Sequence, residues 1–459
     1  MRKFGMIDKI GYAFGDFGND MFFITVSAFL MLFYTDVYGI SPALVGTIFL
    51  VTRLYDAFFD VIWGRFIDSR PTTKQGKFRP WVLRMFVPLL VFDVLVFTYI
   101  PSLTNNMSIV YCFITYMLWA TFYSTVNIPY GSAASVITQD PVERASLSTF
   151  RSVGAAFAGA IVSFLVPLLV FVNGKASASR FLYMAIAFAV VAGVAYLLFY
   201  FMTIERVQAP VGTKQKLDLK ITAKGLIKNR PFLAIVVIFL LLLLASLFGM
   251  GMNSYLFKDY FHNTKALSLA SLVSMVGTLV LAPFVTPLVK RFGKKEVSAV
   301  GTLLSVIIYF IMYLMPTHNA YLFVLLMFLA NLGFGLFNLV SWAFITDAID
   351  YQEILTKTRE DGTIYAFFSF ARKVGQALAG GLTGYALAAI GYVAQKAGEP
   401  PVAQTVQVAN GIKAIATLIP ALVYLAVFLC LQFWYPLTKS KLAEVQQQLK
   451  EIRAAKAEE

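Results

Sequence analysis

The feature that most constrains this chain is the recurrence of apolar stretches as long as a membrane-spanning helix. A helix needs about 20 mostly apolar residues to cross the hydrocarbon core of a bilayer. Twelve stretches reach this length, centred near residues 24, 54, 91, 122, 160, 191, 245, 277, 306, 333, 378 and 423. The alternation of apolar and polar residues that is typical of a membrane β-barrel is absent. Since backbone N–H and C=O groups in hydrocarbon must be hydrogen-bonded within the protein, these stretches are expected to be helices. The pattern therefore predicts an all-α membrane protein with twelve transmembrane helices.

The composition excludes an ordinary soluble protein. Only 14% of the 459 residues are charged and 59% are hydrophobic, whereas a soluble domain carries about 25% charged residues. Cys112 and Cys430 both lie in apolar stretches, so we expect neither a disulfide nor a metal site. The first residues, MRKFGMIDK, do not resemble a cleavable signal peptide, so the first apolar stretch is expected to stay as a span.

The basic residues predict the orientation in the membrane. Of the 38 Lys and Arg residues, 28 lie at the chain ends and in loops on one side, and six lie on the other side. The six are Lys175, Arg180, Lys258, Lys265, Lys396 and Lys413. Since short cytoplasmic loops are rich in Lys and Arg, both termini are expected to be cytoplasmic, with the protein in a cell membrane, the bacterial inner membrane. The same distribution explains the net charge of +14 without a nucleic-acid partner.

The longest basic loop divides the stretches into two groups of six. We expect an N-terminal bundle at residues 1–203, a cytoplasmic linker at 204–230, a C-terminal bundle at 231–436 and a cytoplasmic tail at 437–459. A basic loop follows the second stretch of each half, with the sequences GRFIDSRPTTKQGKFRP and VKRFGKKEV. This weak internal similarity favours the two pseudo-symmetric bundles of a secondary transporter. The tail carries apolar residues at helical spacing, and we expect it to be solvated or to lie on a surface; the alternative is a short helix that binds a partner. These residues are Leu442, Val445, Leu449 and Ile452.

Charged side chains lie inside the predicted spans, where each costs about 2.5–3.5 kcal/mol on insertion scales. They are Asp16, Asp20, Arg53, Asp56, Asp60, Arg151, Arg372 and Lys373. Arg53, Asp56 and Asp60 stand at i, i+3 and i+7 and share one side of the second helix. Carboxylates this close need a proton, a metal cation or an Arg nearby. The cluster therefore predicts a site for a coupling cation, with Asp16, Arg53, Arg151 and Arg372 as charge partners; the alternative is that Asp–Arg pairs only hold helices together.

Two further polar faces suggest a sugar site. The segment YSTVNIPYGSAAS contributes Ser124, Asn127, Tyr130 and Ser132, and SFARKVGQALAGG contributes Ser369, Lys373 and Gln376 at i, i+4 and i+7. Sugars are bound by hydrogen bonds and an aromatic platform, and a carboxylated sugar also needs a cation. We expect a site contacted by both halves, as alternating access requires. The alternatives for Lys373 are snorkelling and a helix–helix salt bridge.

No enzyme chemistry is visible in the sequence. The two histidines, His262 and His318, lie near predicted outer loops, and no glycine-rich phosphate loop follows a strand. We therefore expect a transporter that uses no cofactor other than its co-transported cation. A carrier of another solute class, such as a lysolipid, and a channel remain as alternatives. The sequence leaves the oligomeric state open.

Five segments together resemble the glycoside–pentoside–hexuronide:cation symporters, a branch of the major facilitator superfamily. They are YTDVYGISPALVGTIFLVTRLYDAFFD, KFRPW, VNIPYGS, TDAIDYQE and FFSFARKVGQALAGG. The resemblance covers about residues 8–440 and is greatest to the glucuronide-carrier branch. It implies twelve helices and sugar uptake with H⁺, Na⁺ or Li⁺.

The resemblance also implies roles for single residues. Asp56 and Asp60 match the cation-site acids of the family, and Ser124 matches a hydroxyl residue near the cation. For the sugar, Asp20 matches a hydrogen-bonding acid, Asn127 replaces a second acid of the melibiose-carrier branch, and Arg151 and Lys373 match basic residues. Tyr130 and Gln376 are expected at the substrate from the polar faces described above.

Two departures from the melibiose-carrier branch affect the expected substrates. Phe59 replaces a cation-site Asn and offers no oxygen to sodium, so we expect H⁺ coupling, with Na⁺ as the alternative. Gly131 replaces a Trp platform, and Asn127 removes a negative charge. An anionic glycoside such as a glucuronide is therefore favoured over a galactoside or xyloside.

Overall fold

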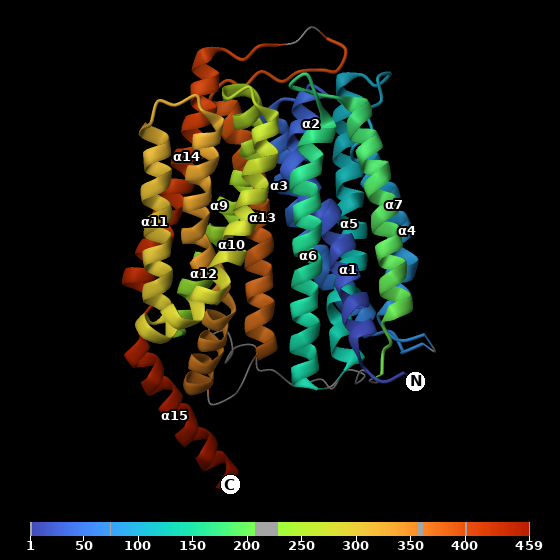
Figure 1. The fold of residues 1–459 in the computed structure, drawn as a ribbon. Coiled ribbons are helices and arrows are strands. Elements are labelled where there is room, and N and C mark those ends of the chain that lie inside the picture. Colours follow the sequence, from blue (N-terminus) through green and yellow to red (C-terminus); the bar gives the residue numbers. More distant parts are fainter. Residues whose placement is uncertain are drawn as a thin grey trace. The chain divides into compact units, whose positions relative to one another are not determined.

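The computed structural model describes residues 2–73, 75–138, 140–206, 228–356, 361–399 and 402–458. These residues are almost entirely helical (Figure 1). The helices of the first part are α1 (Met6–Thr25), η1 (Val26–Leu30), α2 (Met31–Asp36), α3 (Pro42–Asp68), α4 (Arg79–Leu95), α5 (Asn105–Ile137), α6 (Pro141–Val170) and α7 (Ala178–Met202). A short hairpin, β1 (Phe171–Val172) and β2 (Lys175–Ala176), joins α6 to α7.

The second part continues with longer helices. They are α9 (Arg230–Tyr255), η2 (Leu256–Tyr260), α10 (Thr264–Phe292), α11 (Lys294–Leu314), α12 (Ala320–Thr356), α13 (Asp361–Ala389), α14 (Val406–Leu429), η3 (Cys430–Trp434) and α15 (Lys439–Glu458). The η segments are single π-helical turns, so α1 to α2, α9 to η2 and α14 to η3 each run on as one helix. Each of the twelve predicted centres lies inside one of these helices. Within the described residues, eight helices are long and apolar enough to cross a membrane by length and composition alone.

The chain divides into two compact units that do not follow its two halves. The first unit contains Met1–Lys214, Met250–Leu272 and Gly380–Ala409, and the second contains Gln215–Gly249, Val273–Ala379 and Asn410–Glu459. Parts of α9, α10 and α13 therefore belong with the N-terminal helices. Residues 207–227 of the predicted linker lie outside the described residues.

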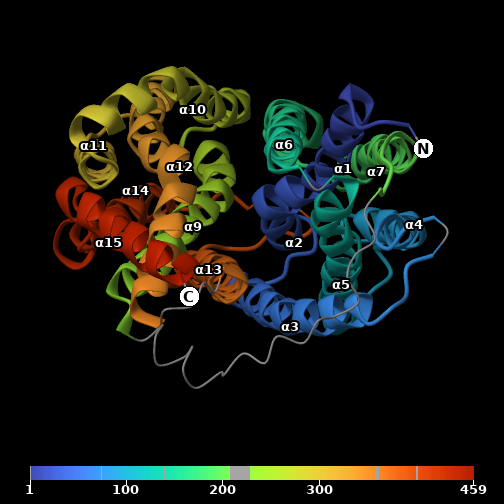
Figure 2. The same ribbon diagram turned by 90° about the horizontal axis from the view of Figure 1, so that it is seen from below.

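Close helix packing in the first unit depends on small residues. In this unit α1 packs on α6 and α7, and α5 packs on α3 and α4, as the view along the helices shows (Figure 2). A Cβ atom added to Gly154 of α6 would lie 2.1 Å from the Ala13 carbonyl oxygen of α1. A Cβ atom on Gly15 would lie 2.2 Å from the Tyr130 ring. Lipid tails are as apolar as the helices, so the hydrophobic effect does little to drive helix association within a membrane. Close packing contributes instead, and small residues such as these glycines allow it.

The second unit has its own core and carries the C-terminal tail. Its helices α11 and α12 approach closely, since a Cβ atom on Gly333 would lie 2.2 Å from the Gly301 carbonyl oxygen. The tail helix α15 packs on α12, with Val445 and Leu449 only 7% and 3% exposed in the core of this unit. The apolar spacing seen in the tail therefore marks the face by which this surface helix packs on its own chain.

Candidate cation and substrate site

The first group of predicted residues meets between α3 and α5. Asp56 is 1% exposed, and the Ser124 hydroxyl donates a hydrogen bond of 2.7 Å to its Oδ1 atom. Arg53 Nη1 lies 3.9 Å from the other carboxylate oxygen, Oδ2. Asp60, one turn further along α3, is half-buried. The structure therefore gives Asp56 a neutral donor on one side and a cation on the other, and both favour the ionised carboxylate.

Aromatic rings surround Arg53, which the sequence analysis considered only as a charge partner. The guanidinium carbon lies 5.5 Å from the ring centre of Phe23, 5.8 Å from that of Tyr116 and 5.5 Å from that of Trp119. The residue itself is 6% exposed. Ring faces attract a cation, and the attraction grows when water is excluded. We call Phe23, Tyr116 and Trp119 the Arg53 cage.

Phe59 also belongs to an aromatic arrangement. Its ring lies 6.0 Å from Tyr55 and 6.1 Å from Trp63, with the planes inclined by 25° and 12°. The side chain therefore stacks within a ladder along α3 and offers no ligand oxygen. Within the described ranges, no group of three or more His, Cys, Asp and Glu residues is arranged to hold a metal ion.

The second group of residues meets between α1, α5 and α6. Arg151 Nε donates a hydrogen bond of 3.0 Å to Asp16 Oδ1, and the Arg151 side chain is 40% exposed whereas that of Asp16 is 8% exposed. The guanidinium lies over the Tyr130 ring at 5.4 Å. Tyr130 is fully buried, stacks on Tyr12 at 4.8 Å and donates its hydroxyl to the Tyr12 carbonyl. Tyr130 thus lies behind Arg151, while Arg151 keeps an accessible side.

A relay of hydrogen bonds reaches Asn127. Asn19 Nδ2 donates to Asn127 Oδ1 at 3.4 Å, and the Tyr196 hydroxyl donates to Asn19 Oδ1 at 2.9 Å. Asp20, beside Asn19 on α1, is half-buried. The sequence analysis did not assign Asn19 or Tyr196. Asn19 is a polar residue within a predicted span, which could have identified it, whereas Tyr196 gave no such signal.

The predicted residues of α13 belong to the second unit. Lys373 and Gln376 are half-buried and Arg372 is exposed. Arg372 lines a cavity of about 340 Å³ whose other polar lining residues are Ser246, Asn338 and Ser341. These three polar residues, on α9 and α12, were not identified from the sequence.

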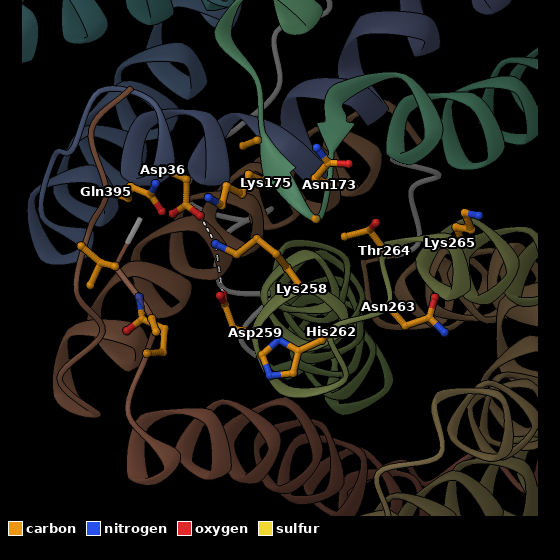
Figure 3. Close-up of a pocket in the computed structure, with 15 residues that line it drawn as sticks. Asp36, Asn173, Lys175, Lys258, Asp259, His262, Asn263, Thr264, Lys265 and Gln395 are labelled. Carbon is orange, nitrogen blue, oxygen red and sulfur yellow. Dashed lines mark hydrogen bonds and ion pairs between the residues drawn. The ribbon is translucent and has the colours of Figure 1, made fainter. Parts of the chain in front are cut away.

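A buried ion cluster lies at the end of the Met6–Asp36 helix that is remote from the N-terminus. Figure 3 shows Lys258 between Asp36 and Asp259, at a cavity of about 650 Å³. Lys258 forms an ion pair with Asp36 and lies 3.2 Å from Asp259 Oδ2, and it donates to the Tyr392 hydroxyl at 3.0 Å. Tyr392 in turn donates to Asp36 Oδ1 at 2.9 Å. We call Asp36, Lys258, Asp259 and Tyr392 the Asp36 cluster.

The Asp36 cluster joins segments that are far apart in the sequence. Burial next to Asp36 and Asp259 raises the pKa of Tyr392 well above its ordinary value, so its hydroxyl stays protonated and continues to donate. Backbone hydrogen bonds of 2.9 Å from Gln395 N to Thr35 O and from Ala397 N to Val37 O extend the connection. The sequence analysis used Lys258 only to predict orientation, because nothing near it in the sequence indicated its distant partner Asp36.

Comparison with known proteins identifies the family. The family model described as MFS/sugar transport protein matches residues 11–439. The chain is 35% identical to the uncharacterized symporter YjmB of Bacillus subtilis, over 98% of this chain and 96% of that protein. It is 34% identical to the glucuronide carrier protein homolog of Escherichia coli, over 95% and 93%. It is 33% identical to the isoprimeverose transporter of Lactiplantibacillus pentosus, over 88% and 84%.

Solved structures show the same fold. The D-xylose-proton symporter superposes with a TM-score of 0.62 at 15% sequence identity, over 95% of this chain and 98% of that one. The nucleoside transporter NupG superposes with a TM-score of 0.61 at 16% identity, over 93% and 100%. The predicted all-α major facilitator fold and the family resemblance are therefore confirmed. The chain belongs to the MFS/sugar transport protein family, in its glycoside–pentoside–hexuronide branch, and is a multi-pass membrane symporter of the sugar type rather than an enzyme.

Proposed function

We propose that this protein imports a glycoside, a glucuronide or a related hexuronide or pentoside, together with a proton, by alternating access. We place it in the bacterial inner membrane with both termini cytoplasmic. The observation that carries the proposal is the buried Asp56 carboxylate, which accepts a hydrogen bond from Ser124 and faces Arg53. Protonation neutralises such a group. In the proposed mechanism this loss of charge allows the surrounding helices to move.

A proton suits Asp56 better than sodium. A proton needs one carboxylate oxygen, whereas an alkali cation needs several oxygen ligands around it. Ser124 and the carboxylates of Asp56 and Asp60 supply oxygens, but Phe59 is stacked between two rings and supplies none. The positive charge of Arg53 opposes a bound proton and a bound sodium ion alike, so the number of oxygen ligands is what separates the two cations here.

The accessible side of Arg151 favours an anionic substrate. The guanidinium has five N–H donors, and Asp16 accepts from its Nε. A Cβ atom on Gly131 would lie 4.0 Å from Arg151 Nη1, with no nearer atom, so the small residue leaves this edge open. A substrate carboxylate can accept two N–H bonds there, while Tyr130 supports the guanidinium from behind. Asp20 and Asn127 are proposed to bind ring hydroxyls.

Two assignments in the second unit rest on the sequence. Lys373 matches a basic residue of the family, and Gln376 shares its helix face at i+3. We propose that both contact the substrate during the transport cycle. The names of two relatives, a glucuronide carrier protein homolog and an isoprimeverose transporter, support a glycosidic or uronic substrate.

Transport by purified protein in vesicles tests the proposal. An inward proton gradient is expected to drive accumulation of a glucuronide above its external concentration, and sugar entry should carry protons inward. A membrane potential of 100 mV adds about 2.3 kcal/mol per charge moved. Accumulation driven by a sodium gradient alone would replace H⁺ with Na⁺ coupling, and failure of every glycoside to accumulate would reject the proposed function.

We also propose that the Asp36 cluster closes one entrance to the carrier and opens during each cycle. Lys258→Met would leave the buried Asp36 carboxylate without its cation, which costs about 3–5 kcal/mol, so the closed form should lose most of its advantage. Val37 is fully buried beside the cluster. We expect a cysteine at this position to react with a membrane-impermeant maleimide at least about tenfold faster in the Lys258→Met protein than in the protein that keeps Lys258. The background protein would have Cys112 and Cys430 replaced.

A matched control distinguishes opening from a general loss of charge. Lys265 is exposed and lines the same cavity, so Lys265→Met should leave the labelling rate within about twofold. Equal rates in the Lys258→Met protein and its parent would show that the cluster does not hold this entrance shut.

A further inference from the structure

A buried acid on α4 takes no part in the mechanism described so far. Asp93 is 1% exposed, and the Trp119 indole Nε1 donates a hydrogen bond of 2.6 Å to its Oδ1 atom. No Lys, Arg or His forms an ion pair with Asp93 among the described residues. A carboxyl group placed in an apolar interior without a cation is costly, so its retention there needs a reason.

The Trp119 side chain connects Asp93 to the cation site. Trp119 is completely buried on α5, stacked between Tyr116 at 5.7 Å and Tyr123 at 5.3 Å, with interplanar angles of 15° and 24°. Its ring also lies 5.5 Å from the Arg53 guanidinium and forms one wall of the Arg53 cage. Arg53 in turn faces Asp56. Each of these contacts involves a different pair of side chains, and together they form a chain from Asp93 through Trp119 and Arg53 to Asp56.

We infer that Asp93 is a positioning residue for cation coupling: it fixes the Trp119 ring against Arg53 and so holds the guanidinium beside Asp56. Without an acceptor, the buried indole N–H would be left unsatisfied, and the ring would turn or shift to find another partner. Because the Arg53 guanidinium is attracted to the face of the Trp119 ring, a shift of the ring is expected to displace the guanidinium as well. This inference rests on the proposed role of Asp56 as the proton-binding group.

The direction of the effect follows from the charge on Arg53. A cation close to a carboxylate favours the ionised form, so a displaced guanidinium makes Asp56 easier to protonate. Uptake that needs protonated Asp56 would then persist to a higher pH. Among the described residues, the titratable and charged groups near the pair include Tyr116 and Tyr123 on α5 and Asp60 on α3. Asp16 and Asp20 on α1 and Arg151 on α6 lie near Tyr123, and Tyr196 on α7 is near Asp93. The test leaves all of them unchanged.

Three variants separate the acceptor from the charge. Asp93→Asn keeps a carbonyl oxygen for the indole and removes the carboxyl charge, whereas Asp93→Leu removes both. Trp119→Phe keeps a ring and removes the N–H donor. In vesicles, Asp93→Leu and Trp119→Phe should each move the pH of half-maximal uptake upward by about 0.5–1 unit, equivalent to about 3–10-fold tighter proton binding. The KM for sugar at low pH should stay within about twofold, and Asp93→Asn should match the parent.

A double variant and a second measurement complete the test. Asp93→Leu/Trp119→Phe should shift the pH profile no more than either single change, because both act on one contact. The protonated carboxyl group of Asp56 can be followed in the purified protein by infrared spectroscopy, where its signal is assigned by its loss in Asp56→Asn. The pH at which this signal is half-maximal should move upward in the same variants. If Asp93→Leu fails to fold, Asp93→Asn and Trp119→Phe carry the same comparison.

The outcomes distinguish this inference from the function on which it rests. A parent protein whose uptake does not depend on pH would reject proton coupling, and the infrared titration of Asp56 would still show whether Asp93 affects that carboxyl group. A pH-dependent parent with unshifted Trp119→Phe and Asp93→Leu profiles would overturn the positioning role. An Asp93→Asn protein that behaves like Asp93→Leu would overturn it too, because charge rather than the hydrogen-bond acceptor would then matter.

Discussion

Asp56→Asn is expected to abolish accumulation of sugar against a gradient, lowering the inside-to-outside ratio to about one. The amide keeps an oxygen that can accept the Ser124 hydrogen bond of 2.7 Å, so the local packing is largely retained. It cannot take up a proton at physiological pH, so the proton gradient can no longer be coupled to the sugar. Exchange of labelled for unlabelled sugar at equal concentrations should continue, because it needs no net proton movement.

The matched control is a carboxylate-to-amide change far from the site. Glu444 is exposed on α15, and Glu444→Gln should accumulate sugar like the parent. Since Asp56→Asn also removes the negative charge 3.9 Å from the buried Arg53, Arg53→Met/Asp56→Asn shows whether lost charge pairing alone is responsible. Undiminished proton-driven accumulation by Asp56→Asn would remove Asp56 from the coupling mechanism.

Local sequence patterns predicted the helices and some of the ion pairs. Twenty-residue apolar stretches are read along the chain, so each centre could be placed without knowledge of the packing. The Arg53–Asp56 pair follows from i, i+3 spacing on one helix. The contact between Ser124 and Asp56 crosses two helices and was expected only from the family resemblance.

Other contacts could not be predicted because they depend on packing between distant segments. Tyr392 donates to Asp36 from 356 positions further along the chain, and nothing in either neighbourhood indicates the other. Tyr116 and Trp119 resemble ordinary residues of an apolar span, so the Arg53 cage had no signature. Tyr130 has a polar atom and suggested a substrate contact, but its hydroxyl is already used by the Tyr12 carbonyl. The division into units also depends on such contacts.

The second large effect is expected at Arg151. Arg151→Gln should weaken binding of an anionic glycoside by about 10–100-fold. The open edge of the guanidinium offers two hydrogen bonds, the glutamine amide can replace one of them, and the lost bond to a charged group contributes about 1.5–3 kcal/mol. A neutral glycoside of the same ring should lose less than about fivefold, since only its hydroxyl contacts change. Calorimetry on the purified protein with a glucuronide and the matching glucoside measures this difference.

The salt bridge to Asp16 provides the control for this prediction. Arg151→Gln leaves a carboxylate whose side chain is 8% exposed without its cation, so part of the effect could come from misfolding. Arg151→Gln/Asp16→Asn removes both charges and should restore thermal stability while leaving the anionic substrate weakly bound. Arg180→Gln, in an exposed position at the start of α7, should bind both sugars normally. If the double variant recovered glucuronide affinity, Arg151 would serve only to neutralise Asp16, and the substrate carboxylate would have to bind elsewhere.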